Sequence, residues 1–273
     1  MPATSDHPDL SRFSRVDTSS DPDSLIAFLQ AHKTLEGLLS AKSAMLSQLR
    51  PEKARNALDV GCGLGDDVIE LARRLPPGAK VTGIDASEAM ITRARRRAAE
   101  AGAEVCFEAG DATSLPFADD SFDACRAERL LIHVPGPQQV IAEMTRVTRA
   151  GGRIAALEPD VGDVVVDHPD QDTTGIIVRT FAAGAVAHGW IGRQLPRMFR
   201  GAGLAEVSVT PVMVLLRLDF FQMMFARHVK QLCADGVLTG SQADRWWSQL
   251  ADAAGNGDFL AGVLFVLVAA TRP

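Results

Sequence analysis

Tyrosine is absent from this sequence of 273 residues, and aromatic side chains make up only 5% of it. No phenol is therefore available as a catalytic acid or base. Basic residues are also in the minority: 28 Lys and Arg residues against 34 Asp and Glu residues give a formal net charge of −6. Proteins that bind nucleic-acid phosphates need a basic face. The composition thus argues against a nucleic-acid partner.

Cysteine is scarce as well, and no two of the four cysteines form a Cys-x-x-Cys pair. Their spacing predicts neither a metal site nor a disulfide framework. Long apolar runs are missing, since the longest, residues 259–270, is too short to span a bilayer. The polar residues 1–23 contain no apolar core of a signal peptide. We therefore expect a cytoplasmic protein with no metal ion and no membrane span.

A glycine-rich turn is the most informative feature that the sequence contains. Residues 57–67 read Ala-Leu-Asp-Val-Gly-Cys-Gly-Leu-Gly-Asp-Asp, so an apolar, strand-like run stops at three glycines and leads into a helical pattern. Gly61, Gly63 and Gly65 permit positive φ angles and let a ligand approach the backbone. The free N–H groups of the next helix's first turn face the same crevice. In open α/β sheets, ligands bind there.

Strands and helices are predicted to alternate between residues 57 and 157. The pattern indicates strands at 57–60, 80–84, 104–108, 122–126 and 153–157, and helices at 66–75, 87–101 and 138–148. Such alternation predicts an α/β protein with a doubly wound, parallel, Rossmann-like sheet and helices on both faces.

The two flanks are predicted to be mainly helical. Apolar residues recur at helical spacing from 24 to 49. After Glu158 we expect a loop at 159–169. The remaining expected elements are helices at 173–188 and 192–203, a strand at 205–210, helices at 218–235 and 241–254, and a strand at 259–269. Helices inserted this late are expected to form a cap over the crevice.

Four acidic residues lie in or beside the predicted strands: Asp59 within the first, Asp85 at the end of the second, Asp111 after the third and Asp123 at the start of the fourth. In Rossmann-like folds, an acidic residue about 20 residues after the glycine turn accepts hydrogen bonds from ribose hydroxyls. Asp85 meets that description. A lone aspartate at a strand end is otherwise a turn or cap residue, and the glycine turn upstream favours the ribose role.

The glycine spacing differs from that of dinucleotide-binding proteins. Their fingerprint is Gly-x-Gly-x-x-Gly, with a pyrophosphate at the helix N-terminus. Here the third glycine comes one residue early and is followed by Asp66 and Asp67. Two carboxylates in the first helical turn repel a phosphate and suit the positive end of the helix dipole. The expected ligand is therefore a nucleoside without phosphates.

These motifs together closely resemble those of class I S-adenosylmethionine-dependent methyltransferases. The resemblance rests on Leu-Asp-Val-Gly-Cys-Gly-Leu-Gly at 58–65, Gly-Ile-Asp-Ala-Ser at 83–87, Gly-Asp-Ala-x-x-Leu-Pro-Phe at 110–117, Ser-Phe-Asp at 121–123, Ile-His-Val at 132–134, Glu-Met-x-Arg-Val at 143–147 and Gly-Gly-Arg at 151–153. Within the class, the sequence resembles the ubiquinone/menaquinone-biosynthesis type and actinobacterial secondary-metabolite methyltransferases, strongly over residues 55–158 and weakly in the flanks.

The resemblance implies seven strands, the last of them antiparallel, with S-adenosylmethionine as methyl donor and S-adenosylhomocysteine as product. It divides the chain into an N-terminal helical segment or lid (1–50), a donor-binding Rossmann-like core (51–158), and acceptor-side helices, a cap insertion and closing strands (159–273). Methyl transfer is an in-line displacement that depends on alignment.

Donor contacts follow from the resemblance position by position. The backbone from Gly61 through Cys62 and Gly63 to Gly65 should hold the methionine end, with Asp59 near its ammonium. Arg126 departs from the small residue usual at its position, and its guanidinium could meet the methionine carboxylate. Asp85 should accept hydrogen bonds from both ribose hydroxyls, and Ala86 and Met90 should pack against the adenine. The adenine's exocyclic amine should lie beside Gly110, Asp111 and Ala112.

Three residues are hypotheses for the chemistry on the acceptor side. His133 matches a family position that faces the acceptor and acts as a general base in some members; otherwise it hydrogen-bonds a loop. Glu158, after the fifth strand, could hold an acceptor amine or hydroxyl. His228 is a second candidate base. A base is needed only if the nucleophile must lose a proton.

The acceptor is expected to be an apolar, ring-containing small molecule from natural-product biosynthesis. Trp190, Phe220, Phe221 and Met224 are expected to contact it, although a Phe- and Met-rich helix can equally be core. O-, N- and C-methylation are left open, as is a homo-oligomer. The alternatives are a cyclase or other non-methylating enzyme on the same fold, and a cofactor-binding regulatory module.

Overall fold

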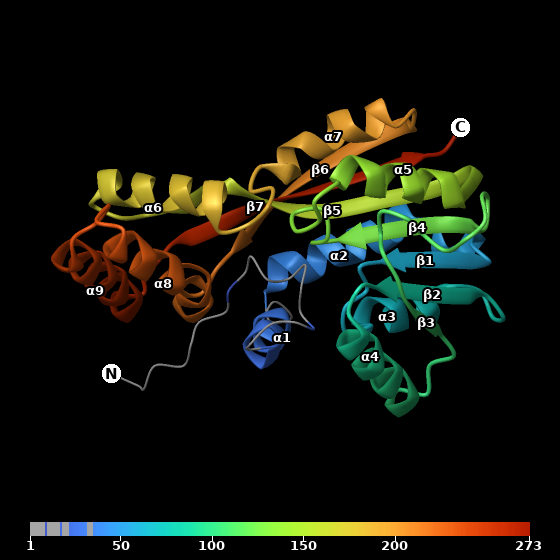
Figure 1. Ribbon diagram of the computed structural model, residues 1–273, viewed down its shortest axis with the longest axis horizontal. Coiled ribbons are helices and arrows are strands. Elements are labelled where there is room, and N and C mark those ends of the chain that lie inside the picture. Colours follow the sequence, from blue (N-terminus) through green and yellow to red (C-terminus); the bar gives the residue numbers. More distant parts are fainter. Residues whose placement is uncertain (1–8, 10–16, 18–21, 32–34) are drawn as a thin grey trace.

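The computed structural model describes residues 9, 17, 22–31 and 35–273. The other residues of the predicted N-terminal segment 1–50 lie outside the described residues. Figure 1 shows an elongated molecule in which strands run along the long axis and helices lie on both sides.

One sheet of seven strands organises the described part of the chain, in the order β3-β2-β1-β4-β5-β7-β6. Its first five strands are parallel, and β7 is antiparallel to both β5 and β6. This topology confirms the predicted fold class. The strands are β1 (Asn56–Val60), β2 (Lys80–Asp85), β3 (Cys106–Ala109), β4 (Phe122–Glu128), β5 (Thr148–Val166), β6 (Ala205–Leu215) and β7 (Ala261–Thr271).

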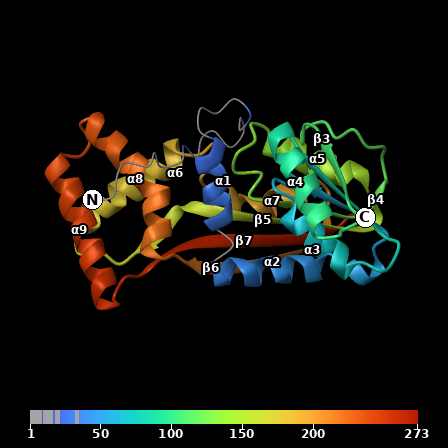
Figure 2. The same ribbon diagram turned by 90° about the horizontal axis from the view of Figure 1, so that it is seen from below.

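Helices cover both faces of the sheet because its central strands are apolar on both sides, as parallel strands usually are. In β1, for example, Ala57, Leu58 and Val60 are all fully buried. Figure 2 shows α2 on the opposite side of β7 from α5 and α7. The helices along the sheet are α2 (Glu36–Gln48), α3 (Asp66–Arg74), α4 (Glu88–Glu100), α5 (Pro137–Val147) and α7 (Ile191–Gly201).

The predicted loop at 159–169 is wrong. Strand β5 continues to Val166, because the long apolar strand β7 lies beside it and pairs Pro159 with Phe265 and Val166 with Ala261 across one irregularity. A partner so distant in sequence leaves no local signal in the residues 159–166. For the same reason β6 extends to Leu215, beyond the predicted end at 210.

The extended ends of β5 and β7 carry a separate group of helices (Figure 1). It consists of α6 (Gln171–Gly184), α8 (Leu218–Ala234) and α9 (Gly240–Asn256). Its centre is the fully buried Trp246, whose Nε1–H donates to Thr174 Oγ1 at 2.9 Å. The short helix α1 (Pro22–Ala31) lies between this group and the parallel strands, where Phe28 stacks on Phe220 with ring centroids 5.3 Å apart.

None of the helices in the described part of the chain combines the length and apolar character that a membrane-spanning segment requires.

Candidate functional site

A cavity of about 1220 Å³ opens at the carboxyl ends of β1, β2 and β4. Most of the predicted donor residues line it: Asp59, Gly61, Cys62, Gly63, Asp85, Ala86, Met90, Gly110, Asp111, Ala112 and Arg126. His133 lines it as well. The structure thus brings together residues spread over more than seventy positions, because parallel strands end at one edge of the sheet.

The glycine turn forms the floor of this cavity. The N–H groups of Gly61 and Cys62 both donate to Ile84 O, at 2.8 and 3.0 Å. Gly61 has φ 74°, and a Cβ there would lie 2.8 Å from Leu130. Gly63 has φ 51° and faces open space. Gly65 does not line the cavity but caps α3, with φ 77°.

Asp85 connects the glycine turn to the start of α4. Its Oδ2 accepts a 2.8 Å hydrogen bond from Gly63 N–H, and its Oδ1 accepts one of 2.9 Å from Ser87 N–H. Burial raises the pKa of Asp85, while these two amides oppose the rise. The carboxylate is held at the cavity wall, where its remaining lone pairs can accept hydroxyl groups of a sugar.

Asp111 also lines the cavity, after the neighbouring strand β3, and its Oδ1 accepts 2.8 Å hydrogen bonds from Thr113 N–H and Thr113 Oγ1–H. Met90 is buried on α4 and packs with Leu25, Ile26 and Leu64. Helix α1 therefore packs against Leu64 of the glycine turn and against α4.

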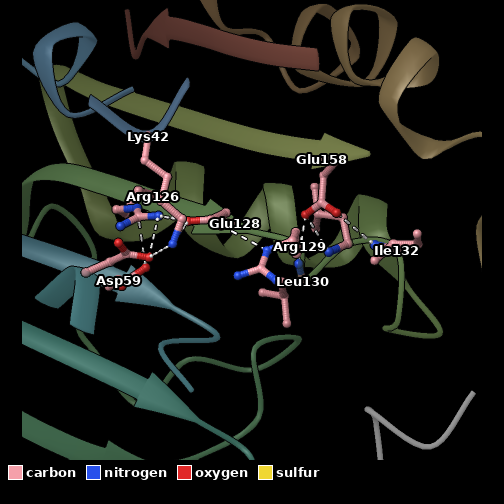
Figure 3. A network of polar contacts seen from close by, with 10 residues as sticks. Lys42, Asp59, Arg126, Glu128, Arg129, Leu130, Ile132 and Glu158 are labelled. Atoms are coloured by element: carbon pink, nitrogen blue, oxygen red, sulfur yellow. Dashed lines mark hydrogen bonds and ion pairs between the residues drawn. The ribbon is translucent and has the colours of Figure 1, made fainter. Parts of the chain in front are cut away.

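A network of charged side chains from β1, β4 and α2 lines part of the cavity (Figure 3). Arg126, only 1% exposed, lies 3.6 Å from Asp59, 3.4 Å from Asp67 and 2.7 Å from Glu128. Its Nε and Nη1 atoms have no hydrogen-bond partner in the described residues. Burial raises the pKa of Asp59 to about 7, although the Arg126 guanidinium lowers it. A cationic and an anionic group of a ligand both find partners here.

Lys42 is part of this network, and the sequence analysis did not single it out. From α2 its Nζ reaches Asp67 at 2.9 Å and Glu128 at 3.1 Å. Lys42 and Arg126 together hold the pKa of Asp67 well below its usual range, against the opposing effect of burial. A lysine on an amphipathic helix gives no sequence signal of such a role, because the contact spans distant elements.

Glu158 does not line either of the two cavities described here. Its fully buried carboxylate accepts hydrogen bonds from the backbone N–H groups of Leu130 and Leu131 at 2.9 and 2.8 Å, and of Ile132 at 3.3 Å (Figure 3). Burial raises its pKa to about 8, and the three amides oppose that rise. Glu158 thereby shapes the turn that carries His133.

A second, smaller cavity of about 90 Å³ adjoins the first and shares His133, Arg129 and Leu29 with it. Its walls are otherwise apolar and come from α1, α6, α8 and the antiparallel strands: Phe28, Leu35, Ile132, Pro159, Val161, Phe181, Val186, Leu216, Phe220, Met224, Val263 and Phe265. Burial, and the nearby Arg129 guanidinium, lower the pKa of His133 to about 3.

Of the residues expected to contact an acceptor, the structure brings Phe220 and Met224 to this apolar cavity. The other two, Phe221 and Trp190, line neither cavity, and neither does the candidate base His228. Phe221 is fully buried and stacks on Phe225. Trp190 covers Gly162 on β5, and His228 lies 2.9 Å from Thr180 Oγ1 between α8 and α6.

The comparisons with known proteins agree with this geometry. A family model described as "Methyltransferase domain" matches residues 51–203, more than half of the chain. The chain belongs to this methyltransferase family. It is a class I S-adenosylmethionine-dependent methyltransferase, as the sequence motifs predicted.

Curated relatives include three bacterial proteins. An uncharacterised 37.1 kDa protein in transposon TN4556 of Streptomyces fradiae is 37% identical over 95% of this chain and 74% of its own length. Methyltransferase GfsG of Streptomyces halstedii is 35% identical over 66% of this chain and 64% of its own. Demethylmenaquinone methyltransferase of Halalkalibacterium halodurans is 30% identical over 69% of this chain and 80% of its own.

Solved structures share the fold. A putative methyltransferase from Bacillus halodurans superposes with a TM-score of 0.63 at 17% identity, covering 86% of this chain and 99% of its own. The [4+2]-cyclase SpnF superposes with a TM-score of 0.56 at 23% identity, covering 86% of this chain and 80% of its own.

S-Adenosylmethionine is accordingly the methyl donor of this enzyme, and the large cavity suits it. A glycine turn open to the cavity, a carboxylate held at its wall and a buried guanidinium whose Nε and Nη1 atoms have no hydrogen-bond partner among the described residues fit a nucleoside that ends in an amino acid. When bound, the donor supplies an activated methyl group on sulfur.

Proposed function

We propose that this enzyme transfers the methyl group to an apolar, ring-containing small molecule of natural-product biosynthesis. The observation that carries the proposal is the apolar cavity, which meets the large cavity at His133 and Arg129. A donor in the large cavity and an acceptor in the apolar one would meet at that boundary.

In the donor site, Asp85 would accept hydrogen bonds from both ribose hydroxyls. It would use the carboxylate lone pairs that are not already engaged by the N–H groups of Gly63 and Ser87. Asp111, beside Gly110 and Ala112, would accept a hydrogen bond from the exocyclic amine of the adenine. Ala86 and Met90 would pack against the adenine ring. The backbone of residues 61–64 would hold the methionine end, with Asp59 near its ammonium and Arg126 near its carboxylate. The buried, unpartnered Nη1 of Arg126 supports the last of these.

On the acceptor side, Phe220 and Met224 would bind the apolar body, and His133 would act as the general base. An acceptor oxygen that still carries a proton would give it to His133, and the oxygen would form the new bond to the methyl carbon with its own electron pair. The pair of the broken carbon–sulfur bond stays on sulfur. Its lowered pKa keeps His133 neutral at physiological pH, as a proton acceptor must be, although a pKa of about 3 makes it a weak base.

The segment 1–50 would act as a lid, and residues 51–158 and 159–273 as donor core and acceptor region. The described part of that lid supports this division, because α1 contacts both cavities. We further propose a cytoplasmic enzyme that binds no nucleic acid. Free cysteines support a reducing compartment. A homo-oligomer is compatible with the proposal.

The test is to incubate the purified enzyme with S-adenosylmethionine and extracts of apolar, ring-containing metabolites, and to follow S-adenosylhomocysteine by mass spectrometry. We expect one S-adenosylhomocysteine for each acceptor molecule that gains a methyl group. Conversion of an acceptor without S-adenosylhomocysteine would instead indicate a cyclase-type reaction, as the fold neighbour SpnF illustrates. Donor binding without any conversion would favour a regulatory module.

A further inference from the structure

Arg129 occupies the boundary between the two cavities. It is the first residue after the central strand β4, and it lines both cavities together with His133 and Leu29. In the apolar cavity, Arg129 and His133 supply the only polar side chains of the described lining. A molecule that fills this cavity thus meets one permanent cation at the end that faces the donor.

The backbone of Arg129 is in the left-handed region, with φ 50°. This conformation is energetically unfavourable for a residue other than glycine, and non-glycine residues that adopt it are concentrated at functional sites. Its N–H donates to Leu157 O at 3.0 Å, which holds the turn in place at the sheet edge. The conformation directs the chain out of β4 and keeps the guanidinium at the junction of the cavities.

The side chain of Arg129 is only partly neutralised. Its Nε lies 2.9 Å from Glu128 Oε1, and this is the one hydrogen bond that its guanidinium makes within the described part of the chain. Glu128 also pairs with Arg126 at 2.7 Å and Lys42 at 3.1 Å. One carboxylate is shared by three cations, and the Arg129 side chain, 17% exposed, keeps two terminal NH₂ groups for a ligand.

We propose that Arg129 selects acceptors whose apolar body carries one acidic oxygen, as a phenol, an enol or a carboxyl group, and binds that oxygen as its anion. The proposal rests on the function proposed above and specifies its substrate class. A guanidinium binds such an oxygen through short charge-assisted hydrogen bonds and repels an ammonium. Because the apolar cavity measures only about 90 Å³, it would hold the reacting end of the acceptor and not the whole of a large one.

Four single-ring probes of similar size test the selection: benzoate, phenol, aniline and toluene. Each is added to the full chain saturated with S-adenosylhomocysteine, and its binding is measured by saturation-transfer NMR and titration. We expect benzoate to bind about tenfold more tightly than aniline or toluene, with phenol between them. Equal binding of all four, or binding of none, would overturn the proposal.

Arg129→Gln should abolish the preference for benzoate and leave toluene binding within about twofold. Arg129→Lys should keep part of the preference for benzoate over toluene, since the positive charge remains. Arg96→Gln, on the exposed face of α4, is the matched control and should keep all of it. The ratio of benzoate to toluene is read within each variant, so a general loss of structure, checked by thermal unfolding, cannot imitate the effect.

The two proposals fail separately. If the enzyme makes S-adenosylhomocysteine but Arg129→Gln retains the preference for acidic probes, the inference on Arg129 is wrong and the methyl transfer stands. If no acceptor gains a methyl group although the probes follow the expected order, the proposed function is wrong and Arg129 is an anion site of another activity.

Discussion

The Oδ2 atom of Asp85 accepts a hydrogen bond of 2.8 Å from the backbone N–H of Gly63. This bond joins the end of β2 to the glycine turn after β1, two segments that meet only in the folded sheet. The same carboxylate thus holds the glycine turn at the floor of the large cavity and lines that cavity, where we propose that it binds the donor. Removing it should affect both.

Asp85→Ala should weaken the binding of S-adenosylmethionine by about 1–3 kcal/mol, because charge-assisted bonds to ribose are lost together with the bond to Gly63. Isothermal titration calorimetry measures the change. Asp252→Ala, an exposed aspartate on α9, is the control and should bind the donor normally. Unchanged affinity of the Asp85 variant would refute the assignment of the ribose.

Donor binding should depend on pH through Asp59, whose pKa burial raises to about 7. A bound ammonium favours the ionised carboxylate, so binding below pH 7 must release a proton. Affinity should therefore rise as the pH increases toward 7, by up to about tenfold per unit, and level off above it. Calorimetry from pH 5.5 to 8.5 tests this. Asp59→Asn should flatten the profile; the same slope in that variant would exclude Asp59.

With an acceptor whose oxygen binds in its protonated form, His133→Ala should lower kcat about 100-fold or more while the dissociation constant of the donor stays within about twofold, since a general base acts only in the chemical step. His228→Ala serves as the matched histidine control and should retain wild-type turnover, because it lies outside both cavities. Single-turnover kinetics separates the two effects. Wild-type turnover without His133 would remove it as the base.

The low pKa of His133, about 3, carries a second consequence. A histidine whose folded pKa lies below its unfolded value stabilises the fold above that unfolded value and loses this contribution as the pH falls from about 6.5 toward 3. The profile of kcat/KM should therefore show no inflection from His133 near pH 6.5. NMR of the imidazole protons, assigned through the His133→Ala spectrum, should show no titration above pH 5.

Glu158→Ala should destabilise the fold by about 3 kcal/mol, because three buried N–H groups at 130–132 lose their acceptor. Urea unfolding measures this loss. Glu158→Gln keeps one acceptor oxygen and should lose less. If the alanine variant lost activity at full stability, Glu158 would be acting on the acceptor and not on the turn.

Gly61→Ala and Gly78→Ala separate backbone strain from steric conflict. Both glycines have positive φ, 74° and 79°, so each alanine should cost about 1 kcal/mol. A Cβ at Gly61 also approaches Leu130 to 2.8 Å, whereas one at Gly78 meets nothing within 4 Å. Gly61→Ala should thus be the more destabilising by about 1–3 kcal/mol. Adding Leu130→Ala should recover part of the difference; full additivity would contradict the steric explanation.

Short motifs made the donor half of the molecule predictable. The glycine turn at 61–65, Asp85 and Asp111 stand directly after strands whose apolar pattern is readable from neighbouring residues. Parallel strands bring such positions to one edge. The seven-stranded fold and the methyltransferase family followed from those local signals.

The acceptor half was predictable only in part. A Phe- and Met-rich run predicted the helix α8. Helical periodicity alone did not separate Phe220 and Met224, which line the apolar cavity, from the buried Phe221. That division depends on α1, whose Phe28 stacks on Phe220. The predicted loop at 159–169 failed for a similar reason, because its pairing partner β7 lies about a hundred residues later.

By itself, then, the sequence determined the fold class, the donor and most of the residues that line the large cavity, since each of these depends on contiguous residues. The tertiary structure decided the rest. It brought Lys42 from α2 into the network around Glu128, turned Glu158 from a candidate acceptor ligand into the anchor of the 130–132 turn, and set Arg129 at the junction of two cavities. The physical reason is common to all three: each side chain gains its role from groups that only the packing of distant elements brings within reach.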